Sequence, residues 1–347
     1  MIGMAVEGVS AATAIAVREG HMAKKTGKAA NTQAMRPSDE GAVPAREAEK
    51  DVLSEEEARA LLEGRDRTHA EALGRQWAVV LGANPAQVMP QVVAQVLAEG
   101  GTRAAWQWLI GEQEHVVMAW PSDQPVRAAV VMRTQERGGQ FKPCDAFPLL
   151  EGLPNDLTVA GTHPWASGSG ANVAVTMMEG KNPMWFYDPF YLRDKNDLTP
   201  GVTHTFTLAG LALGIRKALL DDVTITQGPE YDAHALRWLR DHPGKTRLDV
   251  PPCKVPLNGR HMIMPGRVFG EYQMRATIEE VQDVQLEKMP LKLLRLCFPF
   301  HDRPPLSLPV YASAMVLGEY QPRAGEDADL YVWLQGRVID FDPQEEA

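Results

Sequence analysis

The chain has 347 residues, of which 44% are hydrophobic and 23% are charged. This composition is typical of an ordinary soluble globular protein, and the length is enough for two or three domains. The apolar runs are far shorter than the roughly 20 residues that a membrane helix needs, so we expect no membrane span. The formal net charge of −10 is spread along the chain, which argues against bulk attraction to a nucleic-acid backbone.

Cysteine usage and the N-terminal residues favour a reducing compartment. Cys144, Cys253 and Cys297 lie far apart and form no CxxC pair, so neither a disulfide framework nor a zinc ribbon is expected. The residues before Arg18 are rich in alanine, but they include Glu7 and lack the leucine core of a secretory signal. The sequence also contains no HExxH-like pair of histidines. We therefore expect a cytoplasmic protein with no cofactor and no metal site.

The N-terminal part is expected to change from a tail to a helical region. Residues 1–50 are polar, small and punctuated by proline and glycine, which is the composition of a disordered tail. Ser54 and Glu57 form a capping box that predicts the first helix. A second helix is expected over 68–81. Asn84-Pro85 opens a third, because proline suits the first turn of a helix.

A short fourth helix carrying Trp106 and Ile110 is expected next, followed by a hairpin. The runs 115–120 and 126–134 are rich in β-forming residues, and Ser-Asp-Gln-Pro joins them. We interpret the stretch from Gln135 to Pro148 as a loop. The sequence therefore predicts a small helical region with one β-hairpin.

From residue 157 onward the pattern is mainly β. The segment 211–220 fits a strand and a helix equally well, and 231–240 has the apolar spacing of a short helix, through Ala235, Leu236 and Leu239. Four prolines in 245–268 exclude any long element there and mark the expected domain boundary. Strands are expected over 157–165, 172–180, 183–187, 204–213, 271–286, 291–300 and 306–311, with a last strand near the C-terminus.

These elements predict an α+β protein in which a small N-terminal helical region precedes two mostly antiparallel β-barrel-like domains of the OB type. The number and length of the strands fit an OB-type barrel, and a strongly bent sandwich sheet fits nearly as well. The expected divisions are a tail over 1–50, a helical region with a hairpin over 51–140, a first β-barrel-like domain over 141–245 and a C-terminal OB-like domain over 246–347.

Two stretches of the sequence resemble each other. Pro189-Phe190-Tyr191 and Pro309-Val310-Tyr311 are each followed by a polar segment, a proline, a glycine and an alternating strand. Each strand reaches a further glycine, Gly210 or Gly336, where we expect the strand to bend because a Cβ would clash. Duplication of one unit and convergence on common turn chemistry both account for this internal repeat.

Catalytic motifs are hard to find. His163, Asp188 and His204 are the best candidates for an acid–base site, but none belongs to a local signature of a nucleophile or metal ligand. The loop from Ser167 to Asn172 is rich in glycine, yet it joins two expected strands and lacks the lysine of a phosphate-binding loop. We therefore assign no catalytic residue.

Candidate binding residues fall into two groups. The densest aromatic group surrounds Trp-Phe-Tyr-Asp-Pro-Phe-Tyr, and rings on a barrel face can stack on bases or grip a peptide. The second group is basic and lies in or beside the expected hairpin over 286–303. The predicted binding residues are Trp185, Phe186, Tyr187, Phe190, Tyr191, Trp333, Lys288, Lys292, Arg295 and Arg303.

The sequence thus favours a non-enzymatic binding protein that engages a macromolecular partner through the aromatic group and the basic hairpin. A protein partner is favoured over single-stranded nucleic acid because the net charge is negative. Two alternatives stay open. One is an OB-type protein that binds single-stranded nucleic acid, and the other is a hydrolase or transferase whose site assembles only in three dimensions.

Overall fold

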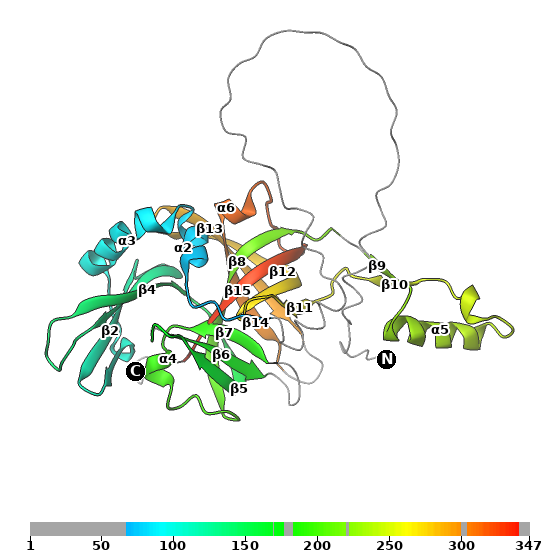
Figure 1. Ribbon diagram of the computed structural model, residues 1–347. Helices are drawn as coiled ribbons and strands as arrows, with labels where there is room; N and C mark the ends of the chain where they lie inside the picture. The colour runs from blue at the N-terminus through cyan, green and yellow to red at the C-terminus, as the bar shows by residue number, and fades with distance from the viewer. Residues whose placement is uncertain (1–66, 169, 177–182, 220–221, 300–303, 340–347) are drawn as a thin grey trace, which may run out of the picture. The chain divides into compact units, whose positions relative to one another are not determined.

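The computed structural model describes residues 67–168, 170–176, 183–219, 222–299 and 304–339 (Figure 1). The expected N-terminal tail, the Ser54 capping box and Arg303 lie outside these residues. The fold is mixed α+β, with mostly antiparallel strands and few helices. The described chain divides into two compact units, one formed by 222–256 and the other by the remaining residues.

A four-stranded antiparallel sheet opens the larger unit, in the order β1-β2-β3-β4. It consists of β1 (Gln107–Ile110), β2 (Gln113–Trp120), β3 (Val126–Arg133) and β4 (Lys142–Leu150). The predicted β2–β3 hairpin is confirmed. The expected fourth helix is wrong, because only Ala104–Trp106 form a 3₁₀ turn (η3) before β1 pairs with β2.

Strand β4 lies in the segment that we interpreted as a loop. Pro143 and Pro148 are unusual in strands, but β4 is the edge of this sheet, where a missing backbone donor is tolerated. The interpretation of 142–148 as a loop is therefore wrong. The four residues that end β4 are buried, so this strand contributes to the core.

Two helices accompany this sheet. Helix α3 (Pro85–Glu99) begins as predicted, since the Asn84 side chain accepts a hydrogen bond from the Ala86 N–H. Helix α2 (Gly74–Leu81) is shorter than the helix expected from residue 68. Thr68 instead forms a β-bridge with Val268, and the segment from 67 to Leu73, which we call the strap, is not helical.

The second sheet has nine strands and takes its members from both expected β domains, in the order β11-β12-β13-β14-β8-β15-β7-β6-β5. The ambiguous segment 211–217 is part of a strand, because β8 pairs with β5, β14 and β15 at the centre of the sheet. The strands are β5 (Leu153–Pro164), β6 (Ala171–Thr176), β7 (Met184–Asp188), β8 (Thr203–Lys217), β11 (Met262–Pro265), β12 (Glu271–Leu286), β13 (Met289–Phe298), β14 (Leu306–Ser313) and β15 (Asp327–Val338).

The same connection pattern occurs twice in this sheet. Strands β5, β6 and β7 lead through the short helix α4 (Tyr191–Asp194) to β8, and β12, β13 and β14 lead through α6 (Ala314–Leu317) to β15. The pairings join β5-β6-β7-β15-β8 into one circuit and β12-β13-β14-β8-β15 into another. The β7–β15 junction has one paired position and β14–β8 has two, so neither circuit is clearly a closed barrel.

The two circuits meet at β8 and β15, where the glycines of the internal repeat lie opposite leucines. Gly336 pairs with Leu208, and Gly210 pairs with Leu334. A Cβ on Gly336 would lie 2.6 Å from Leu208 Cδ2, and a Cβ on Gly210 would lie 2.5 Å from Val332 Cγ1. Each glycine therefore makes room for side chains of the facing strand.

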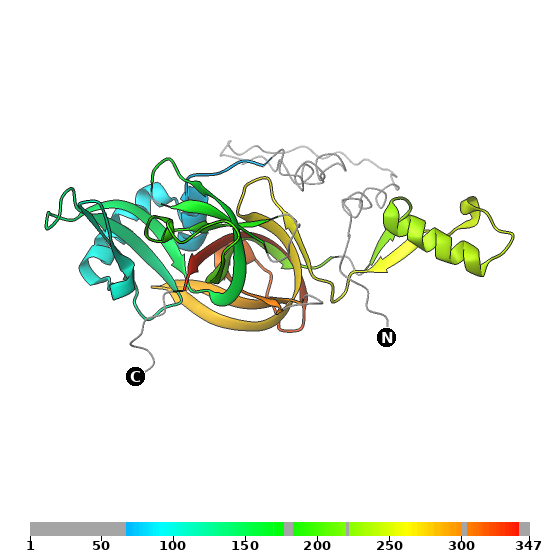
Figure 2. The ribbon, with the colours of Figure 1, turned by 90° about the horizontal axis from the view of Figure 1, so that it is seen from below.

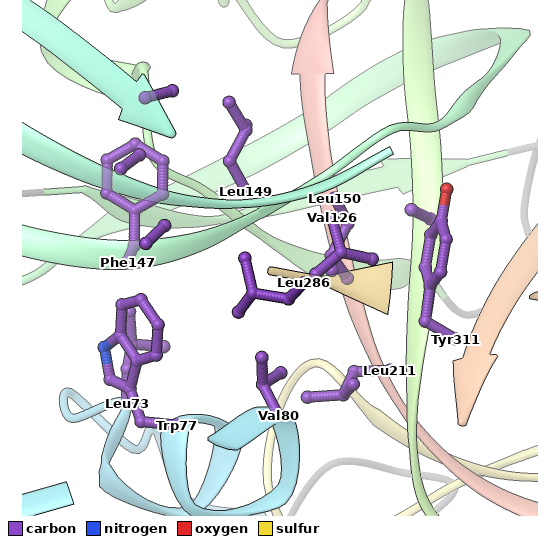
Figure 3. Packing of buried hydrophobic residues seen from close by; sticks show 14 of the residues in the cluster. Leu73, Trp77, Val80, Val126, Phe147, Leu149, Leu150, Leu211, Leu286 and Tyr311 are labelled. Atoms are coloured by element: carbon purple, nitrogen blue, oxygen red, sulfur yellow. The ribbon is translucent and has the colours of Figure 1, made fainter. Parts of the chain in front are cut away.

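Strand β7 separates two hydrophobic cores. Phe186 lies in a core formed by the strands of both circuits, whereas Tyr187 lies in a second core with Trp165, Phe147 and residues of α2. Figure 3 shows part of this second core, where the Trp77 side chain of α2 lies near Phe147 of β4. The strap, the helices and the four-stranded sheet are joined to the larger sheet through it.

The smaller unit, which we call the inserted arm (222–256), lies between β8 and β11 in the sequence. Strands β9 (Asp222–Ile225) and β10 (Cys253–Pro256) pair antiparallel. Between them in the sequence lie α5 (Pro229–Asp241) and the 3₁₀ turn η4 (Arg247–Asp249) (Figure 2). The predicted helix over 231–240 is confirmed. Four apolar residues of the arm are buried: Val223, Ile225, Ala235 and Val250.

Candidate functional site

Most of the aromatic side chains that we predicted as a binding surface are buried. Phe186, Tyr187 and Phe190 have no exposed surface, and Trp333 is 3% exposed. Trp185 and Tyr191 are half-buried. The rings pack within the two cores, because β7 is covered on both faces. Packing therefore accounts for the group, and of its members only Trp185 and Tyr191 present any sizeable surface.

The basic hairpin is β12–β13, and its cations face acids across the strands. Lys292 pairs with Asp283, and Arg295 pairs with Glu280; in each case the two residues are direct cross-strand neighbours. Lys288 is exposed in the turn. Because acids on β12 oppose the basic residues on β13, the hairpin has a mixed charge rather than one positive patch.

The three candidate catalytic residues have separate surroundings. The His163 imidazole contacts the Glu71 carboxylate at 3.3 Å, the His204 imidazole contacts the Asp197 carbonyl at 3.0 Å, and Asp188 is buried. None of these contacts links two of the three side chains. Within the described residues, no group of three or more His, Cys, Asp and Glu side chains could hold a metal ion.

His69 forms the centre of a stack that fixes the strap to the sheet. Its ring stacks on His163 at 3.6 Å and on Phe269 at 4.2 Å between centroids, and the Arg67 guanidinium carbon lies over the Phe269 ring, 4.2 Å from its centroid. Asn172 is buried and its amide donates to His69 Nδ1, which places the proton of a neutral His69 on Nε2. Burial, followed by the nearby His163 and Arg67, lowers the pKa of His69 to about 4.

Asp188 is a buried acid at the end of β7. Its Oδ1 accepts a hydrogen bond from the Phe190 N–H, and its Oδ2 is buried with no hydrogen-bond partner among the described residues. Burial, with a contribution from Asp194, raises the pKa of Asp188 well above its ordinary value. The carboxyl group is therefore neutral over a range in which an ordinary aspartate is ionised.

The inserted arm exposes large apolar side chains. Ala233, Leu236, Arg237 and Arg240 follow one another at positions i, i+3, i+4 and i+7, and all four are exposed. Leu236 is 73% exposed, and Leu248 in η4 is 98% exposed. Leu236 shares the apolar spacing of Ala235 and Leu239, but of these three residues only Ala235 is fully buried. The charged residues at 237 and 240 are the sequence signal that assigns Leu236 to the outer face instead.

Comparison with protein-family models, with curated proteins and with solved structures found no match to this chain. None of the described helices is both long enough and apolar enough to cross a membrane. The fold itself defines a mixed α+β protein. Its nine-stranded sheet repeats one connection pattern, and the inserted arm lies between β8 and β11 in the sequence.

Proposed function

We propose that the protein is a non-enzymatic binding protein that engages a protein partner through the inserted arm. The observation that carries this proposal is the exposure of Leu236 and Leu248, at 73% and 98%, on one small unit. Covering a leucine side chain contributes roughly 1.5–3 kcal/mol, so a partner that buries both gains a useful binding energy. An arm inserted between two strands of a large sheet can also vary without disturbing that sheet.

The charges of the arm favour a protein partner over nucleic acid. Residues 222–256 contain five Lys or Arg and five Asp or Glu, which gives a formal charge of zero. Ion pairs within the arm engage Arg247 with Asp232 and Lys245 with Asp249. A neutral surface that displays leucines lacks the cation excess that phosphate backbones require.

Affinity capture from cells that make the protein tests this proposal. The bait carrying Leu236→Glu and Leu248→Glu is compared with wild type and with a Met315→Glu control, since Met315 is 56% exposed on α6 of the larger unit. Circular dichroism confirms that each bait is folded. We expect a partner that wild type and the control retain and the double variant loses, and the purified partner then binds the double variant at least ~10-fold more weakly. Equal capture by all three baits contradicts the proposal.

One observation favours the alternative that the protein is an OB-type protein that binds single-stranded nucleic acid. Each strand circuit contains five strands, which is the strand number of an OB fold. The half-buried Trp185 and Tyr191 would then be the rings that contact a single strand. Fluorescence anisotropy with short single-stranded DNA and RNA tests it, because phosphate contacts are strongest at low salt. Saturable binding at ~50 mM salt that weakens steeply with added salt would favour this alternative over the protein partner.

We also propose a cytoplasmic location. The three cysteines are free thiols in the structure, which fits a reducing compartment. Fractionation of cells with an antibody against the protein tests this, and recovery in a secreted or membrane fraction contradicts it.

A further inference from the structure

A row of donor and cationic side chains crosses the four-stranded sheet. Trp108 of β1 pairs with His115 of β2, His115 pairs with Arg133 of β3, and Arg133 pairs with Lys142 of β4. Directly paired residues of antiparallel strands present their side chains on the same face. An indole, an imidazole, a guanidinium and an ammonium group therefore lie side by side on one face of this sheet.

The end of the row has an unbalanced positive charge. Like charges directly opposite each other on paired strands are destabilising, yet Arg133 and Lys142 occupy such positions. Within the described residues, neither side chain forms an ion pair or hydrogen bond. The hairpin β12–β13 shows the contrasting arrangement, since Lys292 and Arg295 each face an acid. In a chain of net charge −10, two adjacent unpaired cations call for another explanation.

A small cavity of about 70 Å³ lies against the row. Arg133, His115 and Trp108 line it, together with Cys144, Pro189 and the loop residues Ser167 and Gly168. This volume suits a group of a few heavy atoms, such as a phosphate or a carboxylate. Asp145 follows Cys144 in the sequence. Burial raises the pKa of the Cys144 thiol, Arg133 lowers it, and Asp145 raises it further.

The polar atoms around the cavity are mostly donors. The Trp108 Nε1–H is buried and has no acceptor among the described residues, and an unmet buried donor is rare in native proteins. The His115 Nδ1–H donates to the Gln113 carbonyl, which fixes the ring. Burial lowers the pKa of His115, so its ring is neutral near pH 7 and does not add to the positive charge. A ligand in this cavity would therefore need to supply a hydrogen-bond acceptor for the Trp108 Nε1–H.

We propose that this cavity binds a small oxyanion, the phosphate or carboxylate group of a small molecule. The Arg133 guanidinium pairs with two of its oxygens, and Lys142 adds charge from the neighbouring strand. Bidentate pairs of this kind are the strongest protein contacts to phosphate and carboxylate. The site is separate from the inserted arm and does not depend on the arm's function.

Isothermal titration of the full chain tests the site with inorganic phosphate and with acetate, each against chloride at equal ionic strength. Arg133→Gln is compared with Arg137→Gln, which removes an exposed arginine of the β3–β4 loop and serves as the matched control. We expect Arg133→Gln to weaken binding at least ~10-fold and Arg137→Gln to leave it within about twofold. Arg133→Lys keeps the charge but loses the bidentate fork, so its affinity lies between the two.

The two ligands separate the two sources of the anion. Binding of phosphate alone assigns the site to phosphorylated compounds, and binding of acetate alone assigns it to carboxylic acids. Trp108→Phe keeps an aromatic ring but removes the indole N–H donor. We therefore expect this variant to bind the anion somewhat more weakly than wild type. Absence of saturable binding of both ions at millimolar concentration overturns the proposal. So does equal affinity of wild type and Arg133→Gln.

Discussion

Strands β5 to β8 and strands β12 to β15 have the same connections, and the two sets differ at the buried position that precedes the shared proline. In the first set Asp188 precedes the Pro-Phe-Tyr sequence, and in the second set Leu308 precedes Pro-Val-Tyr. Both residues are inaccessible to solvent. Leu308 belongs to the core of the strand circuits, whereas the Asp188 Oδ2 has no hydrogen-bond partner among the described residues. When the two sequences are aligned at the Pro-x-Tyr motif, the second set has a buried leucine where the first has a buried aspartate.

The two sets also differ in what is attached to them. The strap contacts β5 and β6 of the first set through His69, which stacks on His163 and accepts a hydrogen bond from the Asn172 amide, and it contacts the start of the second set through Arg67, which lies over the Tyr272 ring of β12. The inserted arm follows β8, the last strand of the first set. The second set instead carries the cross-strand ion pairs of β12–β13. The inserted arm is therefore the clearest attachment that follows one set and not the other.

Leu308→Asp is expected to give the largest effect on stability. It removes a buried leucine and buries a carboxyl group among apolar side chains, which together cost about 4 kcal/mol or more. Urea unfolding measures this loss. The reverse change, Asp188→Leu, removes the hydrogen bond from the Phe190 N–H and the interactions with Arg193 and Arg337, but it also removes a buried ionisable group, and it is expected to cost less than about 1.5 kcal/mol at pH 7. If both changes cost the same, the acid is required by the first set.

Alanine substitutions at the paired glycines come next. Gly336→Ala places a Cβ 2.6 Å from Leu208 and 2.8 Å from the Phe186 ring, and overpacking of this kind costs roughly 1–3 kcal/mol. Gly210→Ala meets Val332 and Val310 in the same way. The control is Gly214→Ala on β8, whose Cβ would lie 3.7 Å from Tyr331, an ordinary contact. Equal unfolding midpoints for all three variants would show that the circuits are not tightly packed at their junction.

The pH dependence of stability separates Asp188 from an ordinary aspartate. Its pKa is raised in the folded state, so its contribution to stability is greatest below the unfolded value of 3.8 and is lost as the pH rises toward the folded value. Asp188→Asn removes this titration. The stability of the variant relative to wild type should therefore increase between pH 4 and pH 7. A difference that is constant over this range contradicts the burial of an ionisable group.

His69 should have the opposite pH dependence. Its pKa is lowered from 6.5 to about 4 in the folded state, so its contribution is complete above pH 6.5 and is lost as the pH falls toward 4. Protonation would also break the hydrogen bond from Asn172 to Nδ1. We expect limited proteolysis of the strap to accelerate in this range for wild type. His69→Phe keeps the stack but cannot titrate, so its cleavage rate should change less.

The smallest effect is expected in the second set. Lys292→Ala removes the ion pair with Asp283, in which the Lys292 and Asp283 side chains are 29% and 85% exposed. Pairs of this kind contribute roughly 0.2–1 kcal/mol and are screened by salt. The loss measured by urea unfolding should shrink when the salt concentration is raised. A salt-independent loss would assign the effect to packing of the lysine stem.

Regular elements with local signals were predictable from the sequence. Strand β12 has the expected bounds, because its long β-rich run has turn residues at its C-terminal end. Helix α3 begins where Asn84 and Pro85 indicate. The prediction that β7 contributes to a binding surface has no support in the burial of Phe186 and Tyr187, and there is a physical reason for this. The two faces of β7 pack into different cores, so Phe186 and Tyr187 are both buried, and no alternation marks an exposed face.

The candidate sites depend on register, which the sequence specifies poorly. The Trp108–His115–Arg133–Lys142 row exists because three pairs of strands align these positions, one of them beyond the bulge between Val131 and Met132. Because the sequence does not specify the register, it also did not predict that Glu280 and Asp283 lie opposite the basic residues of β13. The strap depends on the bridge between Thr68 and Val268, which are distant in sequence.

Site-specific photo-crosslinking in cells that make the protein tests most directly whether the arm contacts a partner. A photoreactive phenylalanine analogue replaces Leu236 or Leu248 on the arm, and Met315 on α6 is the exposed control. If the arm is the docking site, one discrete adduct forms at the two arm positions and none forms at Met315. Adducts of the same mass at all three positions, or no adduct on the arm, would contradict the proposed function.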